Sequence, residues 1–414
     1  MHAVKLIIRG SFWDSQLYSG NLLLFDMSGI LHRLNWKSLV GQIADMNADI
    51  QTAIRVAFSE SDLLYAQAGK VVIKDPAIKV IISDQLERLS NRTVEVSSRL
   101  YKAHVWTIGD VFDFLPIDTD VYYNRIIAAD DHGLYSVEQY ADFSKNRNAI
   151  KKHHDGRILQ IKASRKNTAV AAAGGQDGLF EFSVNTQGSD FIKNKKNIAS
   201  MPCSACEWAL NSIFGWSDND ACLASFCDEK QKKSRTTNRV FEKTLDQEQI
   251  LEKAALKSNG RPRIWGSHEK LYALTSKVLQ VVDFRPASKI KQPDSDRVTA
   301  YKAKFTKVGE IFVDFNASQV IATGTALFGV VVELNDMLVV IKSDNSVERF
   351  DGAPVHWRIF PRSSRYSNQL HIIYDDHMVI VSFSHDYFIV QANKLAGFVK
   401  GGRDEGFLQE IDFI

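Results

Sequence analysis

The fold is decided by the stretch Ile158-Leu-Gln-Ile-Lys-Ala-Ser164, Thr168-Ala-Val-Ala-Ala-Ala-Gly-Gly175, Gln176-Asp-Gly178 and Leu179-Phe-Glu-Phe-Ser-Val184. Its first segment mixes apolar and polar residues as a half-buried strand does. The second segment consists of small residues that neighbouring elements can approach closely. The Asp-Gly pair predicts a tight turn, because glycine adopts positive φ without steric cost. The last segment alternates again, so the stretch predicts the middle of one four-stranded sheet.

The same hairpin recurs along the whole chain. Its turns are centred near residues 27, 68, 131, 176, 219, 276, 325 and 376. Propeller blades repeat at about 40–50 residues, and the longer steps here indicate insertions. Strands are also predicted before or after several hairpins, at Ala53–Phe58, Ile78–Ile82, Val111–Leu115, Arg263–Gly266, Ile311–Phe315, Leu338–Ile341, Val355–Phe360 and Tyr387–Val390.

We therefore predict an all-β protein, a single β-propeller domain spanning 1–414. The hairpin count favours eight four-stranded blades over seven. The approximate units are 1–43, 44–85, 95–140, 150–197, 200–245, 259–285, 305–350 and 353–395, with a C-terminal tail at 396–414. We expect Val4–Ile8 to pair with the last blade and so cover a sheet edge. The alternative is a pair of β-sandwiches, but the recurring turn with matched flanks favours the propeller.

This pattern resembles the WD-repeat type of propeller across nearly the whole chain. The family's Trp-Asp dipeptide at the end of the third strand is replaced here by Asn35-Trp36, Ser183-Val184 or Val282-Asp283. The resemblance implies a rigid platform that holds partners through its loops.

Three segments are predicted to be insertions. Residues 246–257 have good helix formers, apolar residues at 250, 251, 254 and 255, and acidic residues first, which indicates a short helix. Residues 288–297 are expected to form an exposed loop. Residues 228–238 are polar throughout and are expected to form a mobile loop.

Composition gives limited guidance on function. The 414 residues carry a formal net charge of +2, which does not demand a nucleic-acid partner. The apolar run Leu6–Ile8 is too short for a signal-peptide core, and no run approaches the ~20 apolar residues of a membrane span. We expect a cytoplasmic protein without a membrane partner.

Four cysteines, Cys203, Cys206, Cys222 and Cys227, approximate the spacing of a zinc ribbon. Two of them are five residues apart on one predicted strand, which places them on opposite faces. Buried cysteine also packs as a small hydrophobe. A core role is therefore favoured over zinc, and we expect no cofactor.

Acidic and histidine clusters are interpreted as turn formers rather than metal sites. They are Asp130-Asp-His132, Asp375-Asp-His377 and His153-His-Asp155, together with the pairs Asp118/Asp120, Asp218/Asp220 and Asp294/Asp296. The chain contains no nucleophile elbow, phosphate loop, zinc-protease helix or kinase motif set. We therefore predict no enzymatic activity.

Basic residues concentrate in the middle of the chain and predict one basic sector. Its members are Lys145, Arg147, Lys151, Lys152, Arg157, Arg165, Lys166, Lys193, Lys195, Lys196, Lys232, Lys233 and Arg235. Such a sector can hold a phosphate backbone, although a solvated face is the plainer interpretation. We predict a non-catalytic interaction scaffold or recognition subunit with protein partners. The first alternative is a nucleic-acid-associated subunit, and the second is a propeller hydrolase with a channel metal.

Overall fold

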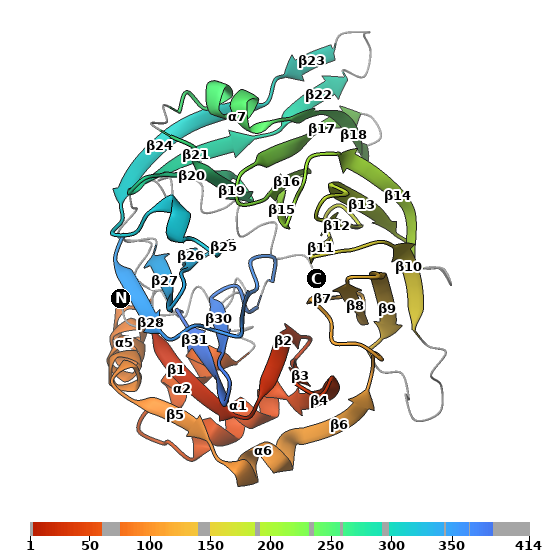
Figure 1. The fold of residues 1–414 in the computed structure, drawn as a ribbon. Helices are drawn as coiled ribbons and strands as arrows, with labels where there is room; N and C mark the ends of the chain where they lie inside the picture. Colours follow the sequence, from red (N-terminus) through yellow and green to blue (C-terminus); the bar gives the residue numbers. More distant parts are fainter. Residues whose placement is uncertain are drawn as a thin grey trace. The chain divides into compact units, whose positions relative to one another are not determined.

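The computed structural model describes residues 3–59, 75–139, 150–186, 191–231, 236–256, 260–291, 298–342, 345–363 and 365–383. The chain divides into two compact units. Unit 1 comprises 1–115, 142–146 and 322–414, and unit 2 comprises 116–141 and 147–321. Each unit contains sheets built around antiparallel strands, and Figure 1 colours the elements along the chain.

The strands form seven sheets, and all seven contain the same arrangement of four antiparallel strands, each paired with the next. This meander is the blade of a β-propeller. Three blades belong to unit 1 and four to unit 2. The prediction of an all-β propeller is confirmed, but the preference for eight blades is wrong, since there are seven.

Unit 1 contains blades 1, 6 and 7 and a helical insertion. Blade 1 consists of β2 (Phe12–Tyr18), β3 (Asn21–Asp26), β4 (Ile30–Asn35) and β6 (Val105–Asp110); blade 6 consists of β25 (Ala322–Ala326), β26 (Gly329–Glu333), β27 (Met337–Lys342) and β28 (Val347–Asp351); blade 7 consists of β29 (His356–Ile359), β30 (Gln369–Ile373), β31 (His377–Ser382) and β1 (Val4–Arg9).

Unit 2 contains blades 2 to 5. Blade 2 consists of β7 (Asp118–Tyr122), β8 (Arg125–Asp130), β9 (Gly133–Glu138) and β10 (Lys151–Asp155); blade 3 of β11 (Gln160–Ser164), β12 (Ala169–Ala173), β13 (Leu179–Val184) and β14 (Ile192–Ala199); blade 4 of β15 (Ala205–Ala209), β16 (Ser212–Trp216), β17 (Ala221–Gln231) and β18 (Thr236–Leu245); blade 5 of β19 (Arg263–Ser267), β20 (Lys270–Thr275), β21 (Val278–Arg285) and β24 (Lys304–Phe312).

Blade 3 is built from the stretch that predicted the fold. All five residues of β12 are buried, so this small-residue strand lies inside the core. The turn into β13 needs glycine at position 178 for two reasons. Gly178 has φ +92°, and a Cβ there would lie 2.1 Å from the carbonyl oxygen of Ala199. The core of unit 2 lies between neighbouring blades, where Ile127 of β8 packs in one cluster with Ile161 of β11 and Phe182 of β13.

A helical insertion replaces the predicted second blade. It lies between β4 and β6 and contains α1 (Trp36–Asp45), α2 (Gln51–Phe58), α5 (Pro76–Ser90), β5 (Thr93–Val96) and α6 (Ser98–His104). The strand predictions at Ala53–Phe58 and Ile78–Ile82 are therefore wrong, because these residues lie in α2 and α5. The hairpin predicted around residue 68 lies outside the described residues.

Helix α5 has a clear local origin. Asp75 accepts hydrogen bonds from the backbone N–H groups of Ala77 and Ile78, and Pro76 occupies the first turn. Ile82, Leu86 and Leu89 are buried, at the spacing of one helical face. The run Ile78–Ile82 resembles a strand when it is considered alone. The residues that reveal the helical period, Leu86 and Leu89, lie after this run.

The two ends of the described chain share blade 7. Strand β1 pairs antiparallel with β31, from Val4 opposite Ser382 to Arg9 opposite His377. The predicted pairing of Val4–Ile8 with the last blade is confirmed. On its other side β1 pairs in parallel with β5 of the helical insertion. The insertion thus covers an edge that would otherwise expose unpaired backbone groups.

The predicted helix at 246–257 is found as α7 (Gln247–Lys253), with Asp246 as its N-cap. A 3-10 turn, η2 (Ala317–Gln319), precedes β25. Two further strands, β22 (Ala287–Lys291) and β23 (Val298–Tyr301), lie between β21 and β24. Among the helices of the described residues, none is both long and apolar enough to cross a membrane.

Candidate interaction surface

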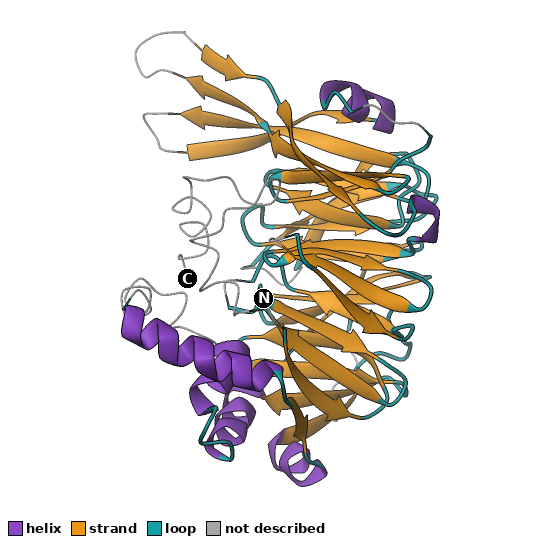
Figure 2. Ribbon diagram, turned by 90° about the vertical axis from the view of Figure 1, so that its left-hand side faces the viewer, coloured by secondary structure: helices purple, strands orange, loops and turns teal. Residues whose placement is uncertain are grey.

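The most distinctive surface of unit 2 is a sheet added to blade 4, which we call the appendage sheet. It consists of the distal parts of β17 and β18 together with β22 and β23, in the order β18-β17-β22-β23. Strand β17 is 11 residues long, but only residues 221–224 pair with β16. The remainder extends past the blade, as Figure 2 shows for the long strands.

Two loop predictions are corrected by this sheet. Residues 228–231 and 236–238, expected in a mobile loop, continue β17 and β18, whereas 232–235 lie outside the described residues. Residues 288–291, expected in a loop, form part of β22, and 292–297 are likewise outside the described part. The reason is cross-strand pairing: β17 pairs with β18 on one side and with β22 on the other, so each of these polar segments has a partner strand.

The register of the appendage sheet assigns its residues to two faces. Arg239, Asp228, Ser288 and Tyr301 occupy one row across the four strands. Directly opposed residues share a face and side chains alternate along a strand, so the neighbouring row, Asn238, Glu229, Lys289 and Ala300, occupies the other face.

The sheet presents apolar side chains to solvent. Tyr301 is 55% exposed, Phe241 46% and Val240 40%. Thr299, Ala300, Thr237 and Asn238 are also exposed. A sheet normally buries at least one face against another layer, so this one is suited to hold a partner.

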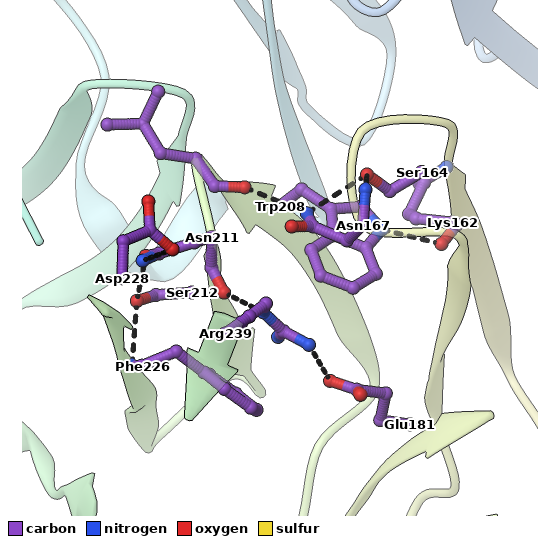
Figure 3. Close-up of polar contacts among 11 residues, drawn as sticks. Lys162, Ser164, Asn167, Glu181, Trp208, Asn211, Ser212, Phe226, Asp228 and Arg239 are labelled. Atoms are coloured by element: carbon purple, nitrogen blue, oxygen red, sulfur yellow. Dashed lines mark hydrogen bonds and ion pairs between the residues drawn. The ribbon is translucent and has the colours of Figure 1, made fainter. Parts of the chain in front are cut away.

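Arg239 anchors the base of the appendage sheet to the neighbouring blade (Figure 3). Its Nη1 donates to Glu181 Oε2 of β13 at 2.8 Å, and both side chains are largely buried. The guanidinium also lies 3.4 Å from the ring centroid of Phe226 and 5.2 Å from that of Trp208. Burial lowers the pKa of Arg239, while the charge of Glu181 opposes that shift.

A chain of hydrogen bonds surrounds this arginine. Arg239 Nε donates to the carbonyl of Asn211, whose side-chain amide donates to Asp228 Oδ1 at 2.8 Å. Ser212 Oγ donates to Asn211 Oδ1 at 3.0 Å and accepts from the backbone N–H of Phe226 at 3.0 Å. The start of the projecting part of β17 is thereby held rigidly.

Two further hydrogen bonds join blade 3 to this region of blade 4. Asn167 Nδ2 donates to the carbonyl of Leu210 at 2.9 Å, and Trp208 Nε1 donates to the carbonyl of Lys162 at 2.7 Å. The first contact joins the β11–β12 turn to the β15–β16 turn, and the second joins strand β11 to strand β15 (Figure 3). Sequence reasoning did not identify Asn211 or Glu181, because each acts through partners distant in sequence.

The basic residues predicted as one sector lie on several elements of unit 2. Lys151 and Lys152 are on β10, Lys193, Lys195 and Lys196 on β14, Arg165 and Lys166 in the β11–β12 turn, and Arg157 between β10 and β11. All eight are exposed. The remaining members, Lys145, Arg147, Lys232, Lys233 and Arg235, lie outside the described residues.

Two contacts bring the outer strands side by side. Lys195 Nζ of β14 lies 3.3 Å from His154 Nδ1 of β10. Thr244 Oγ1 of β18 donates to the carbonyl of Ile198 of β14 at 2.6 Å. Lysines from separate blades therefore face solvent along neighbouring edges. Burial and the charge of Lys195 both lower the pKa of His154.

Part of this positive charge is balanced locally. Lys152 Nζ lies 2.6 Å from Asp155, and Arg157 Nε lies 2.6 Å from Asp131. Exposed pairs of this kind contribute little to stability. The carboxylates of Asp155 and Asp131 lower the positive electrostatic potential that an anionic partner would meet.

The cysteines are all buried, and the structure brings two of them together. The Sγ atoms of Cys203 and Cys222 lie 3.8 Å apart within the core between blades 3 and 4. The hydrogen bond between them and their burial raise the pKa of the Cys203 thiol, and burial raises that of Cys227. Across the described ranges, no three or more His, Cys, Asp or Glu side chains are grouped as metal ligands would be.

The acidic residues behave in two ways. Asp130 accepts from the backbone N–H groups of His132 and Gly133, as a turn former does. Asp118 and Asp120, however, are not in a turn. They lie on β7, where their carboxylates accept backbone N–H groups of Ile161 and Ala163 on β11, each at 2.8 Å. That prediction is wrong because the carboxylates join two blades.

The other acidic groups have separate positions. Asp218 and Asp220 form ion pairs with Arg263 and Arg261, respectively. Asp376 Oδ1 lies 2.6 Å from Nδ1 of His377, at hydrogen-bonding distance. Asp294 and Asp296 are outside the described residues.

Seven blades with this strand order settle the fold. The chain is a divergent WD-repeat-like β-propeller. No protein-family model matches it, and no curated protein matches its sequence. Solved structures that are similar to it include the WD40 β-propeller domain of Doa1, at 9% identity and TM-score 0.45, covering 90% of this chain and 93% of that one. The WD40 domain of Pan2 from Neurospora crassa is similar at 8% identity and TM-score 0.42, covering 94% and 92%. The CNH domain of AfRom2 gives 9% identity and TM-score 0.33, covering 63% and 91%.

Proposed function

We propose that this propeller is a non-catalytic protein-interaction subunit and that a protein partner docks on the appendage sheet. The observation that carries the proposal is a four-stranded sheet that exposes Tyr301, Phe241 and Val240. Its base is held by Arg239, so the surface is presented without a large ordering cost on binding. The buried cysteines and the acidic residues that join blades have structural roles in this proposal.

The β22–β23 hairpin can be removed without cutting a blade. Arg285 of β21 and Lys304 of β24 are direct antiparallel partners. Replacing residues 286–303 with an Asn-Gly turn would therefore connect β21 and β24 as a tight hairpin. Blade 5 keeps all its strand pairs in this variant.

The test is capture of partners from native lysate by the wild-type chain and by this hairpin-deleted variant. A variant with Lys193, Lys195 and Lys196 changed to Gln serves as a control with altered charge elsewhere. We expect specific proteins to be retained by the wild type and the control but lost from the deleted variant. Equal retention by all three chains contradicts the proposal.

A second candidate function is binding of nucleic acid by the outer strands. The observation that favours it is the alignment of β10, β14 and β18 through Lys195–His154 and Thr244–Ile198. Lysines spread over adjacent strands hold phosphates without reading sequence. Lysine on an edge strand also discourages aggregation, so a test must separate these roles.

For this second function, Lys151, Lys152, Lys195 and Lys196 are changed to Glu. Retention on immobilised nucleic acid is measured over a salt series. Binding that weakens steeply with salt and is lost in the variant supports the function. No retention of the wild type at low salt refutes it.

A further inference from the structure

Strand β23 ends the appendage sheet, and within the described part of the chain no strand pairs with its outer side. Alternate residues of an edge strand direct their N–H and C=O groups outward. The sequence of β23, Val-Thr-Ala-Tyr, contains β-branched and aromatic residues and no charge. Such a strand is well suited to pair with another.

Two outer strands of blades, β14 and β28, carry charged residues, unlike β23. Strand β14 contains Lys193, Lys195 and Lys196, and β28 contains Glu348, Arg349 and Asp351. Charges at an edge prevent unwanted pairing. The chain thus protects these edges and leaves β23 without a charge.

The segment around β23 is basic. Residues 285–304 contain six basic residues, Arg285, Lys289, Lys291, Arg297, Lys302 and Lys304, and two acidic residues, Asp294 and Asp296. Lys289 is 43% exposed at its side chain, and its Nζ lies 3.3 Å from Glu229 of β17. An added strand would therefore meet positive charge, which favours an acidic partner.

The residues on the two faces of the sheet determine which side chains an added strand should carry on each side. Tyr301 and Thr299 lie on the same face as Ile290, whereas Lys289 and Ala300 lie on the opposite face. Side chains of an added strand also alternate between faces. Apolar residues would contact Tyr301 while acidic residues would lie on the side of Lys289.

We propose that β23 binds an extended protein segment in which acidic and apolar residues alternate, by adding it as a fifth strand to the appendage sheet. This inference rests on the proposed function and specifies its partner. Main-chain hydrogen bonds supply affinity in this mode, and the side chains on each face supply specificity. A nucleic acid has no backbone N–H or C=O groups with which to continue a sheet.

The probe is a short fluorescent peptide that alternates Glu and Val, and binding is followed by fluorescence anisotropy. Three comparison ligands are used: the same peptide with alternate backbone nitrogens methylated, the same composition without alternation, and a single-stranded oligonucleotide of equal charge. Methylation removes the hydrogen-bond donors and keeps every side-chain charge. We expect the methylated and non-alternating peptides to bind about tenfold more weakly or worse.

Substitutions and a deletion in the β22–β23 hairpin test whether the peptide binds at β23. Thr299→Glu combined with Tyr301→Glu places acidic side chains on the edge strand, where they repel an acidic segment, and should weaken binding about tenfold. Deletion of 286–303 should abolish binding while blade 5 remains folded, as judged by circular dichroism. The matched control is Thr237→Glu with Asn238→Glu on β18, the opposite edge, which should leave binding unchanged.

Three results overturn the inference. They are equal binding of the methylated peptide, tighter binding of the oligonucleotide, and loss of binding in the β18 control rather than the β23 variant. If lysate proteins still depend on residues 286–303 while the peptide fails to bind, only this inference falls and the proposed function stands. If those proteins do not depend on the hairpin, the proposed function itself fails.

Discussion

Arg358 of β29 donates two hydrogen bonds to the carboxylate of Asp14 on β2, with Nε–Oδ1 at 2.9 Å and Nη2–Oδ2 at 2.7 Å. Both side chains are almost completely buried, at 6% and 2% exposure. The pair joins the first strand of blade 1 to the first strand of blade 7 within unit 1. Bidentate geometry makes this a strong charge-assisted contact.

Replacing Arg358→Met should destabilise the protein by about 3 kcal/mol, because the Asp14 carboxylate would remain buried without its partner. The measurement is the free energy of unfolding in urea. The control is Arg92→Met, which breaks an ion pair with Asp49 whose side chains are about half exposed; it should cost less than about 1 kcal/mol. Equal losses in the two variants would show that the buried pair has no special role.

The stability of unit 1 should depend on pH through His371. This side chain is fully buried, its Nδ1 lies 2.9 Å from Ser15 Oγ, and burial together with the charge of Arg358 lowers its pKa to about 3. In the unfolded chain a histidine has a pKa of about 6.5. Between these values the unfolded state binds the additional proton, so stability falls as pH decreases through this range.

The expected slope from this one group is about 1.4 kcal/mol per pH unit at most. Comparing urea unfolding of the wild type and His371→Asn across this range isolates it from carboxylate titrations. The variant should show a flatter decline on acidification. Parallel curves would contradict the assignment.

The four cysteine thiols should be unreactive in the folded protein. All are buried, and the pKa values of Cys203 and Cys227 are raised, so little nucleophilic thiolate is present near neutral pH. Titration with a chromogenic disulfide reagent should detect them only after denaturant is added. Release of stoichiometric zinc on thiol modification would instead favour the metal site.

Gly266→Ala should destabilise unit 2 by about 1–3 kcal/mol through overpacking. A Cβ at this position of β19 would lie 2.3 Å from Cδ2 of Phe214 on β16. The matched control is Gly41→Ala in α1, where no atom lies within 4 Å of the new Cβ. That control should be neutral or stabilising by up to about 1 kcal/mol. Thermal unfolding of both variants distinguishes the outcomes, and an unaffected Gly266→Ala would contradict the close packing.

Much of the blade pattern was predictable, because a strand and a tight turn leave a local signal. The alternation at Leu179–Val184 and the glycine at 178 both arise within a few residues. Helix α7 was predicted for the same reason: its N-cap and helix formers are contiguous. The helical insertion was missed because Ile78–Ile82 fits a strand until Leu86 and Leu89 are counted with it.

The candidate site was only partly predictable. Basic residues were predicted at 232–235, but residues 228–238 and 288–297 were expected to form loops, and no strand was predicted at β23. A weak signal existed in Val298-Thr-Ala-Tyr301, whose residues favour strands. Nothing in the local sequence connects β22, its hairpin partner, to β17, because the paired residues Cys227 and Ala287 are 60 positions apart.

The sequence by itself determined the propeller blade and its repetition, since hydrophobic period and turn chemistry are local properties. The pairing of β1 with the last blade was predicted from a different argument, the need to cover a sheet edge. The tertiary structure alone decided that there are seven blades, that Asp118 and Asp120 join β7 to β11, and that two polar hairpins pair as one sheet. Each of those outcomes depends on hydrogen bonds between residues far apart in the chain. A polar segment becomes a strand or a loop according to whether another strand lies beside it, and only the folded chain supplies that neighbour.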